Sequence, residues 1–228
     1  MAFLFWKRFK TISDLRTADL KLKKVRRSDV KIAIIDDEPI EIMDILKSHK
    51  FNIDLIPKIE SINILGEYDI IICDIHGVGE AFSKEFQGAY LVKEIYKQYP
   101  FKIIISYTGI TYDARYNEYL KHAEFSLKKD VSSEDFVEKL DAAISLIQDP
   151  VHRWNKIKNY LVENDVPTYE IALIEDDFVR RLLSNQDFND FPKKKVSIRF
   201  SNRACVCLTK RRTIAHLCRL SALRWRIG

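Results

Sequence analysis

The sequence predicts an α/β fold, a five-stranded doubly wound parallel sheet over residues 30–148. Short apolar runs alternate with amphipathic segments five times, which is the pattern of repeated βα units. The apolar runs are continuous rather than alternating, so both of their faces are expected to be buried beneath helices. Acidic residues follow two of these runs, at the edge where parallel sheets form their binding sites.

Each predicted strand is a run of large apolar residues bounded by polar or turn-forming residues. The first run, KIAII, spans 31–35 and leads directly into Asp36 and Asp37. Right-handed crossovers leave the doubly wound order as the natural arrangement of five such strands. The later runs are NIDLIP over 52–57, YDIIIC over 68–73, KIIIS over 102–106 and AEFSL over 123–127.

The segments between these runs have apolar residues at helical spacing. The last one, over 132–148, is expected to begin at an N-cap of Ser132 or Ser133, with acids in its first turn. Pro100 is expected to end the helix that precedes the fourth strand. The remaining helices are predicted over residues 40–49, 59–67, 89–100 and 112–122.

Composition places the chain among globular proteins, with 46% hydrophobic and 31% charged residues in a length of 228. No run approaches the roughly 18 to 20 apolar residues of a membrane span. Four cysteines in a chain of this length do not make a disulfide scaffold, and a reducing, cytoplasmic location is expected. The net charge of +5 is uneven, because both ends are basic and the middle is acidic.

The flanks are predicted to form separate parts of the chain. Residues 1–29 carry nine Lys or Arg against three Asp and are expected to be a basic helical extension, for which an anionic membrane surface is one predicted partner. Residues 149–190 are expected to be helical. Residues 191–228 carry eleven Lys or Arg and no acid. Under one hypothesis the chain is a DNA-binding regulator and this basic tail binds nucleic acid. Under another the tail is solvated or disordered.

The end of the tail, over 203–228, has a composition abruptly different from the rest. Two interpretations stay open, a disordered basic arm and a frame-shifted end of a longer natural sequence. Its Cys and His residues lack the paired C-x₂-C spacing of zinc sites, so zinc is not expected at Cys205, Cys207, His216 and Cys218.

Three carboxylates are expected to converge at the carboxyl edge of the sheet. Asp36 and Asp37 follow the first strand, and Asp74 follows the third. Such a group suits a hard cation such as Mg²⁺, which prefers oxygen ligands. An aspartate held beside that cation is also able to attack a phosphoryl group and form an acyl phosphate. Ser106, after the fourth strand, and a lysine after the fifth supply a hydroxyl and a cation for the phosphoryl oxygens.

At this point the segment from about 30 to 148 resembles a response-regulator receiver domain of the CheY-like superfamily, a flavodoxin-like fold. The resemblance rests on IIDDEP, YDIIICDI, IIISYTG and LKKDVSSEDFVEKL. It implies that Asp74 is the phosphoacceptor and Ser106 the switch hydroxyl. It also implies that Asp36, Asp37 and Asp74 bind Mg²⁺ together with the backbone carbonyl of His76.

The resemblance leaves the lysine ambiguous between Lys128 and Lys129. In the family the switch aromatic stands three residues before the lysine, so Phe125 as that aromatic selects Lys128, which we prefer. Counting back from the last helix selects Lys129, the alternative. The loop after Asp74 departs from the family, because it is about six residues longer before Gly88 and lacks the usual proline.

The implied function is two-component signal transduction, in which a histidine kinase or phosphotransfer protein donates a phosphoryl group to Asp74. A downstream protein is expected on the face formed by residues 112–122, 123–127 and 132–148. The chain is not expected to be an enzyme beyond assisting its own phosphoryl transfer and dephosphorylation. A third hypothesis is an interaction module that keeps the receiver fold without phosphorylation.

Overall fold

The structure, a computed structural model, divides into two compact units. One unit comprises residues 25–149, and the other combines residues 1–24 with 150–228. The residues whose structure is described are 8–16, 18, 20, 24–109, 113–188 and 191–192.

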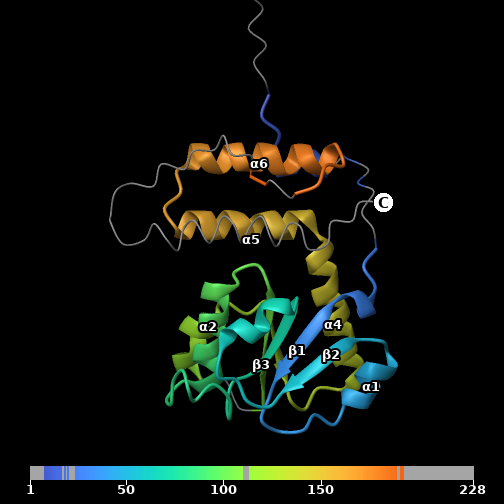
Figure 1. The fold of residues 1–228 in the computed structure, drawn as a ribbon, viewed down its shortest axis with the longest axis vertical. Helices are drawn as coiled ribbons and strands as arrows, with labels where there is room; N and C mark the ends of the chain where they lie inside the picture. The colour runs from blue at the N-terminus through green and yellow to red at the C-terminus, as the bar shows by residue number, and fades with distance from the viewer. Residues whose placement is uncertain are drawn as a thin grey trace, which may run out of the picture. The chain divides into compact units, whose positions relative to one another are not determined.

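The unit over 25–149 is built on a five-stranded sheet in which every neighbouring pair of strands is parallel (Figure 1). The strand order is β2-β1-β3-β4-β5, which confirms the predicted doubly wound fold. The strands are β1 Lys31–Ile35, β2 Asn52–Ile56, β3 Ile70–Asp74, β4 Ile103–Thr108 and β5 Phe125–Lys128.

Helices cover both faces of this sheet, as the continuous apolar strands require. One face packs against α1 (Met43–Ser48) and α4 (Ser133–Gln148), which bury Leu46, Phe136 and Leu140. The opposite face packs against the 3₁₀ helix η3 (Ile62–Glu67) and α2 (Gln87–Gln98). Successive side chains of β1 alternate between these two cores, so the isoleucine-rich strand supplies both.

Several elements are shorter than the sequence predicts. The helix predicted over 40–49 forms only at α1, since the chain turns after Pro39 before it becomes helical. The segment predicted over 59–67 is the 3₁₀ helix η3, in which buried Ile62 and Leu65 stand three residues apart and match the three-residue turn of that helix. The segment predicted over 112–122 becomes η4 (Ala114–Tyr116) followed by one turn, α3 (Asn117–Leu120).

The second unit contains two longer helices, α5 (Pro150–Glu163) and α6 (Thr168–Leu183). Its core is aromatic, and the ring of Phe178 lies 5.5 Å from those of both Trp154 and Phe188. In the described part of residues 1–29, the helix expected from sequence is reduced to two 3₁₀ turns, η1 (Ile12–Leu15) and η2 (Arg27–Asp29).

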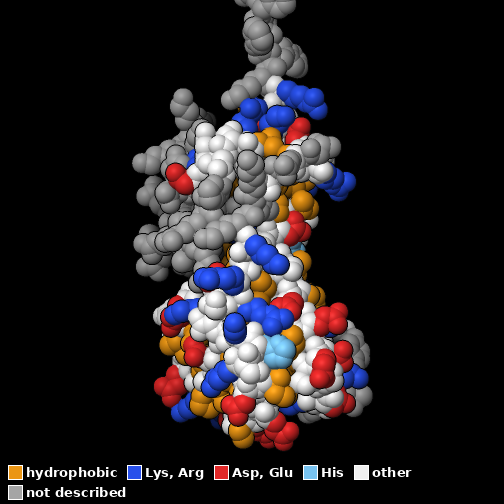
Figure 2. Space-filling model, turned by 90° about the vertical axis from the view of Figure 1, so that its right-hand side faces the viewer, with side chains coloured by type: hydrophobic (Ala, Val, Ile, Leu, Met, Phe, Trp, Pro, Cys, Tyr) orange, Lys and Arg blue, Asp and Glu red, His pale blue; other side chains and the backbone are white. Residues whose placement is uncertain are grey.

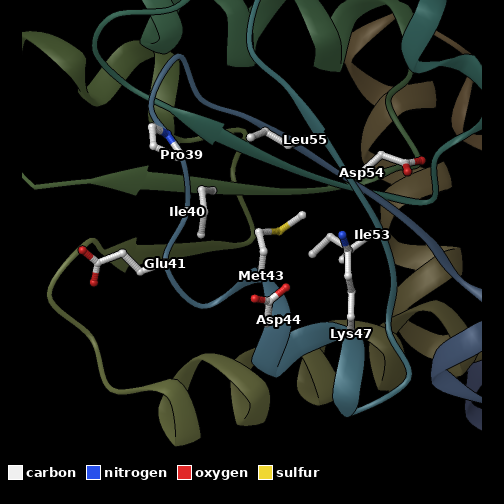
Figure 3. Close-up of a pocket in the computed structure, with 9 residues that line it drawn as sticks. All are labelled: Pro39, Ile40, Glu41, Met43, Asp44, Lys47, Ile53, Asp54 and Leu55. Atoms are coloured by element: carbon white, nitrogen blue, oxygen red, sulfur yellow. The ribbon is translucent and has the colours of Figure 1, made fainter.

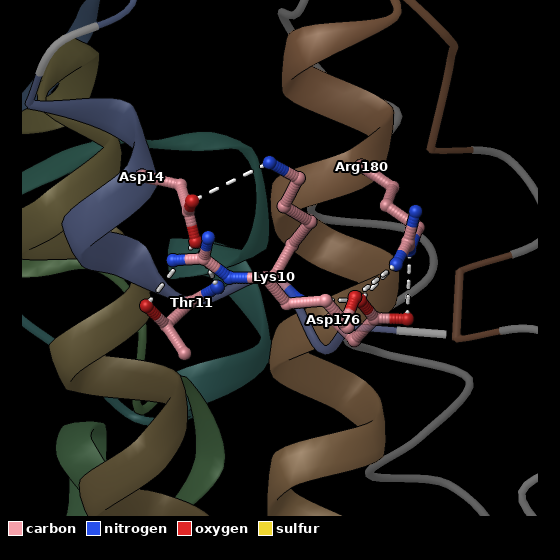
Figure 4. A network of polar contacts seen from close by, with 6 residues as sticks. Lys10, Thr11, Asp14, Asp176 and Arg180 are labelled. Atoms are coloured by element: carbon pink, nitrogen blue, oxygen red, sulfur yellow. Dashed lines mark hydrogen bonds and ion pairs between the residues drawn. The ribbon is translucent and has the colours of Figure 1, made fainter. Parts of the chain in front are cut away.

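Polar contacts hold η1 against α6 within this unit (Figure 4). The backbone N–H of Lys10 donates to Asp176 Oδ1 at 2.7 Å, and the N–H of Ile12 donates to Glu175 Oε1 at 2.8 Å. Arg180 pairs with the same Asp176 carboxylate. The acids of α6, which are unusual in a helix that would read DNA, therefore anchor the N-terminal segment.

Surface charges of both signs are interspersed on the face of the unit 25–149 drawn in Figure 2. Among the described residues, no helix combines the length and hydropathy that crossing a membrane would require.

Candidate functional site

Three carboxylates meet at the carboxyl edge of the sheet, as predicted. Asp74 is the last residue of β3, and Asp36 and Asp37 directly follow β1, its neighbour in the sheet. One ligand atom from each carboxylate lies within 4.8 Å of the other two. Asp36 and Asp74 are 1% and 4% exposed, whereas Asp37 faces solvent. Two buried like charges at this distance require a cation nearby.

Lys129 supplies that cation. Its Nζ lies 2.8 Å from Asp74 Oδ2 and 3.0 Å from Asp36 Oδ2, with exposed Glu38 at 3.5 Å. Burial alone would lower the pKa of Lys129, but its hydrogen bonds to Asp74 and Asp36 outweigh burial and raise that pKa above its ordinary value. The ammonium group therefore stays charged among the carboxylates.

The preference for Lys128 is corrected by this geometry. Lys128 is exposed at the end of β5, while Leu127 before it is buried and Lys129 after it is partly buried. The alternation of side chains along a strand continues one residue past β5 and directs Lys129, not Lys128, to the acidic cluster. The spacing from the last helix was the correct guide.

The switch aromatic expected at Phe125 is corrected with it. Phe125 packs against the apolar core on the α4 side of the sheet. The residue three positions before Lys129 is Ser126, which pairs with Ser106 in the register of β4 and β5. The hydroxyl of Ser106 donates to Ser126 Oγ at 2.7 Å. A small hydroxyl side chain thus stands where the resemblance led us to expect a ring.

Burial shapes the electrostatics around Asp74. It raises the pKa of Asp74, opposed by the hydrogen bond from Lys129 and by the backbone N–H of His76, which donates to Asp74 Oδ1 at 3.2 Å. Burial also raises the pKa of Cys73, with the carboxylates of the site adding to the shift, so this thiol stays protonated. The role predicted for the His76 carbonyl stays a prediction.

The long loop after β3 lies directly against the site. Gly77 has φ +79°, and a Cβ on it would stand 2.3 Å from Asp37 Oδ1. Its N–H donates to Gln87 Oε1 at 3.0 Å. A Cβ on Gly88 would stand 1.8 Å from the carbonyl oxygen of Asp74. The two glycines therefore allow the backbone to approach the cluster more closely than any side chain would permit.

Aromatic contacts connect this loop to the helices η4 and α3. The ring of His76 meets that of Tyr116 edge-on, with centroids 5.5 Å apart. The ring of Phe86 lies 6.3 Å from Tyr116 and 4.8 Å from Tyr119. The loop, which the sequence showed only as an unusual insertion, thus packs beside the site on one side and against η4 and α3 on the other.

The donor set fits a divalent cation such as Mg²⁺. The three carboxylates offer hard oxygen ligands within reach of one centre, and the backbone at Gly77 leaves space beside Asp37 that a Cβ would fill. Asp36, Asp37 and Asp74 would hold the cation.

A separate pocket of about 430 Å³ lies between α1 and the edge strand β2 (Figure 3). Met43 and Lys47 line it from α1, and Ile53 and Leu55 line it from β2. None of the three clustered carboxylates borders this pocket, so the chemistry of the site is at the end of the sheet rather than in the pocket.

Three residues of the site were missed in the sequence. Ser126 was discoverable by counting back three positions from Lys129. Glu38 stood in the quoted motif after the acidic pair, without a signal for its role. Gln87 gave no signal, because its contact with Gly77 depends on the path of the long loop.

No family model and no curated protein matches the sequence. Solved structures similar to part of the chain include receiver domains and response regulators. A CheY-like response regulator receiver domain protein from Methanospirillum hungatei is 19% identical at a TM-score of 0.40, covering 51% of this chain and 94% of its own. A two-component response regulator from Clostridium difficile is 23% identical at a TM-score of 0.44, covering 53% and 99%. A response regulator from Thermotoga maritima is 15% identical at 0.43, covering 51% and 98%.

The fold is decided by the sheet itself, in which all strands are parallel and the order is β2-β1-β3-β4-β5. Residues 25–149 have the flavodoxin-like, doubly wound fold. Residues 1–7 and 193–228 lie outside the described residues. The predictions made for them therefore stay predictions: the membrane contact, the basic tail, the frame-shifted end and the absence of zinc at the cysteines. The division of the chain into four parts stays a prediction.

Proposed function

We propose that the chain is a two-component response regulator whose Asp74 accepts a phosphoryl group from a phosphohistidine of a histidine kinase or phosphotransfer protein. The observation that carries this proposal is the contact of nearly buried Asp74 with Lys129, beside Asp36 and Asp37. A nucleophilic carboxylate, a fixed cation and a set of metal ligands are the parts that phosphoryl transfer to an aspartate needs.

In the proposed reaction, an Oδ atom of Asp74 attacks the phosphorus atom of the phosphohistidine. The P–N bond breaks, and the imidazole nitrogen leaves with the electron pair and takes up a proton. Asp74 becomes an acyl phosphate, which water later hydrolyses to carboxylate and phosphate. Mg²⁺, when bound by the three carboxylates, supplies neutralisation of the charge on the phosphoryl oxygens. Lys129, already 2.8 Å from Asp74, adds a second positive charge on the protein side.

The acyl phosphate adds about −1.5 to −2 charge and three acceptor oxygens at the end of β3. Lys129 and Ser106 are the groups expected to turn toward those oxygens. Ser106 belongs to β4, and the segment after β4 leads into η4 and α3. The proposed output is a change in partner binding on the surface of α3, β5 and α4, with no reaction on an external substrate.

The test is intact mass after incubation of the full chain with phosphoramidate, whose P–N bond stands in for phosphohistidine. We expect a single phosphoryl adduct with Mg²⁺ and none with excess EDTA. Asp74→Asn should form no adduct, and Asp54→Asn, on the edge strand β2, should react like the wild type. Absence of an adduct from the folded wild-type protein with Mg²⁺ would support the phosphorylation-independent interaction module instead.

A further inference from the structure

The hydroxyl groups of Ser106 and Ser126 face each other across β4 and β5. The register pairs the two residues directly, and the Ser106 hydroxyl donates to Ser126 Oγ at 2.7 Å, an ordinary length for a well-formed hydroxyl hydrogen bond. A second contact of Ser106, to the carbonyl oxygen of Phe125, is longer at 3.4 Å. Ser106 is 1% exposed, whereas Ser126 faces solvent. Ser126 Oγ is therefore the better placed of these two acceptors for the Ser106 proton.

A serine hydroxyl carries one proton and donates one hydrogen bond at a time. The proposed function requires Ser106 to donate to a phosphoryl oxygen on Asp74. In the structure the Ser106 hydroxyl is hydrogen-bonded to Ser126 Oγ instead, 2.7 Å away. We infer that Ser126 is a positioning residue that holds Ser106 in its resting conformation, and that this bond must be released when a phosphoryl group is bound. The inference deepens the proposed function and rests on it.

The position of Ser126 in β5 makes this role specific. The strand alternates, so Phe125 enters the apolar core while Ser126 lies on the face of Ser106. Three residues further along, Lys129 contacts Asp74. One short segment thus carries both the resting partner of the switch hydroxyl and the cation of the site.

The hydrogen bond between Ser106 and Ser126 is strong enough to weaken the binding of a phosphoryl group but too weak to prevent it. A neutral hydrogen bond of this kind shifts an equilibrium by about two- to tenfold. A hydrogen bond from Ser106 to a charged phosphoryl oxygen is roughly twice as strong as a neutral one. Ser106 therefore bonds to the phosphoryl oxygen when that group is present. Ser126 weakens the binding of the phosphoryl group by the factor of the neutral bond, about two- to tenfold.

The test is a titration of the full chain with beryllofluoride in excess Mg²⁺, followed by the ¹⁹F NMR signal of the bound species. We expect Ser126→Ala to bind beryllofluoride about two- to tenfold more tightly than the wild type. Ser126→Thr keeps the hydroxyl and should stay close to the wild type, as should Ser145→Ala on α4. In a Ser106→Ala background, Ser126→Ala should have no effect, which a general structural role of Ser126 would not produce.

Unchanged or weaker binding by Ser126→Ala, while the wild type binds, would overturn this inference and leave the proposed function standing. The inference would also be overturned if Ser126→Ala raised the affinity for beryllofluoride in the Ser106→Ala background as much as in the wild type. If the folded wild type binds no beryllofluoride in Mg²⁺, the proposed function fails and the inference fails with it.

Discussion

Replacement of Lys129 by methionine removes the cation from the acidic cluster and keeps a side chain of similar length. The Asp36 and Asp74 carboxylates then face each other with ligand atoms no more than 4.8 Å apart. At an effective dielectric constant of about 20, two such charges repel by about 3 kcal/mol. Removing one partner of a buried charge pair typically costs about 3–5 kcal/mol. Because 26% of the Lys129 side chain is exposed, the lower end of that range, about 3 kcal/mol, is expected.

The assay is hydrogen exchange of peptides covering β1 and β3, measured by mass spectrometry at neutral pH in EDTA. It reports the stability of the sheet separately from that of the helical unit. A loss of about 3 kcal/mol corresponds to exchange roughly a hundredfold faster. Excess Mg²⁺ should slow exchange more in Lys129→Met than in the wild type, because a divalent cation replaces the missing charge.

The matched control is Lys128→Met, next along the chain but exposed. It should change the stability of the sheet by less than about 0.5 kcal/mol, as most surface substitutions do. Equal effects of the two substitutions, or wild-type exchange in Lys129→Met, would refute the assignment of Lys129 as the cation of the site.

Three further predictions concern other parts of the chain. Gly77→Ala places a Cβ 2.3 Å from Asp37 Oδ1, at a backbone φ of +79° that favours glycine. The affinity for Mg²⁺, measured by calorimetry, should therefore fall at least about tenfold. Unchanged affinity would contradict the loop geometry. Burial lowers the pKa of Lys102 from 10.5 to about 8. Between these two pH values the unfolded chain binds more protons than the folded chain. The free energy of unfolding therefore rises with pH across this range. The gain, about 3 kcal/mol, should be absent from urea denaturation curves of Lys102→Met, and parallel pH dependence in both proteins would count against it. Phe178→Ala should lower the free energy of unfolding of the α5–α6 unit by about 3–5 kcal/mol in exchange measurements on α5, and a loss below about 1 kcal/mol would show that the aromatic cluster is not its core.

The sheet was predictable because its strands are unusually uniform. Ile70, Ile71 and Ile72 are buried on alternating faces, and a run of this kind suits the centre of a parallel sheet. Parallel neighbours then bring Asp36, Asp37 and Asp74 to one edge without further information. The acidic cluster therefore followed from strand pattern alone.

The lysine and its neighbours were harder to predict because a shift of one residue reverses the face of a strand. Phe125 resembles a switch aromatic in sequence, yet it packs against the core, while Ser126 contacts Ser106 and Lys129 contacts Asp74. The contacts of the long loop, such as Gly77 against Asp37, depend on left-handed backbone conformations that composition does not specify. Helix lengths also differed, since three-residue spacing in η3 satisfies burial as well as an α-helix does.

The central claim is that Asp74, among the three clustered carboxylates, accepts the phosphoryl group. Borohydride reduces an aspartyl phosphate to homoserine, and peptide sequencing by mass spectrometry then locates the residue. After treatment with phosphoramidate and Mg²⁺, homoserine is expected at position 74 and not at Asp36 or Asp37. Homoserine at either of those positions, or an adduct that borohydride does not convert, would contradict the account.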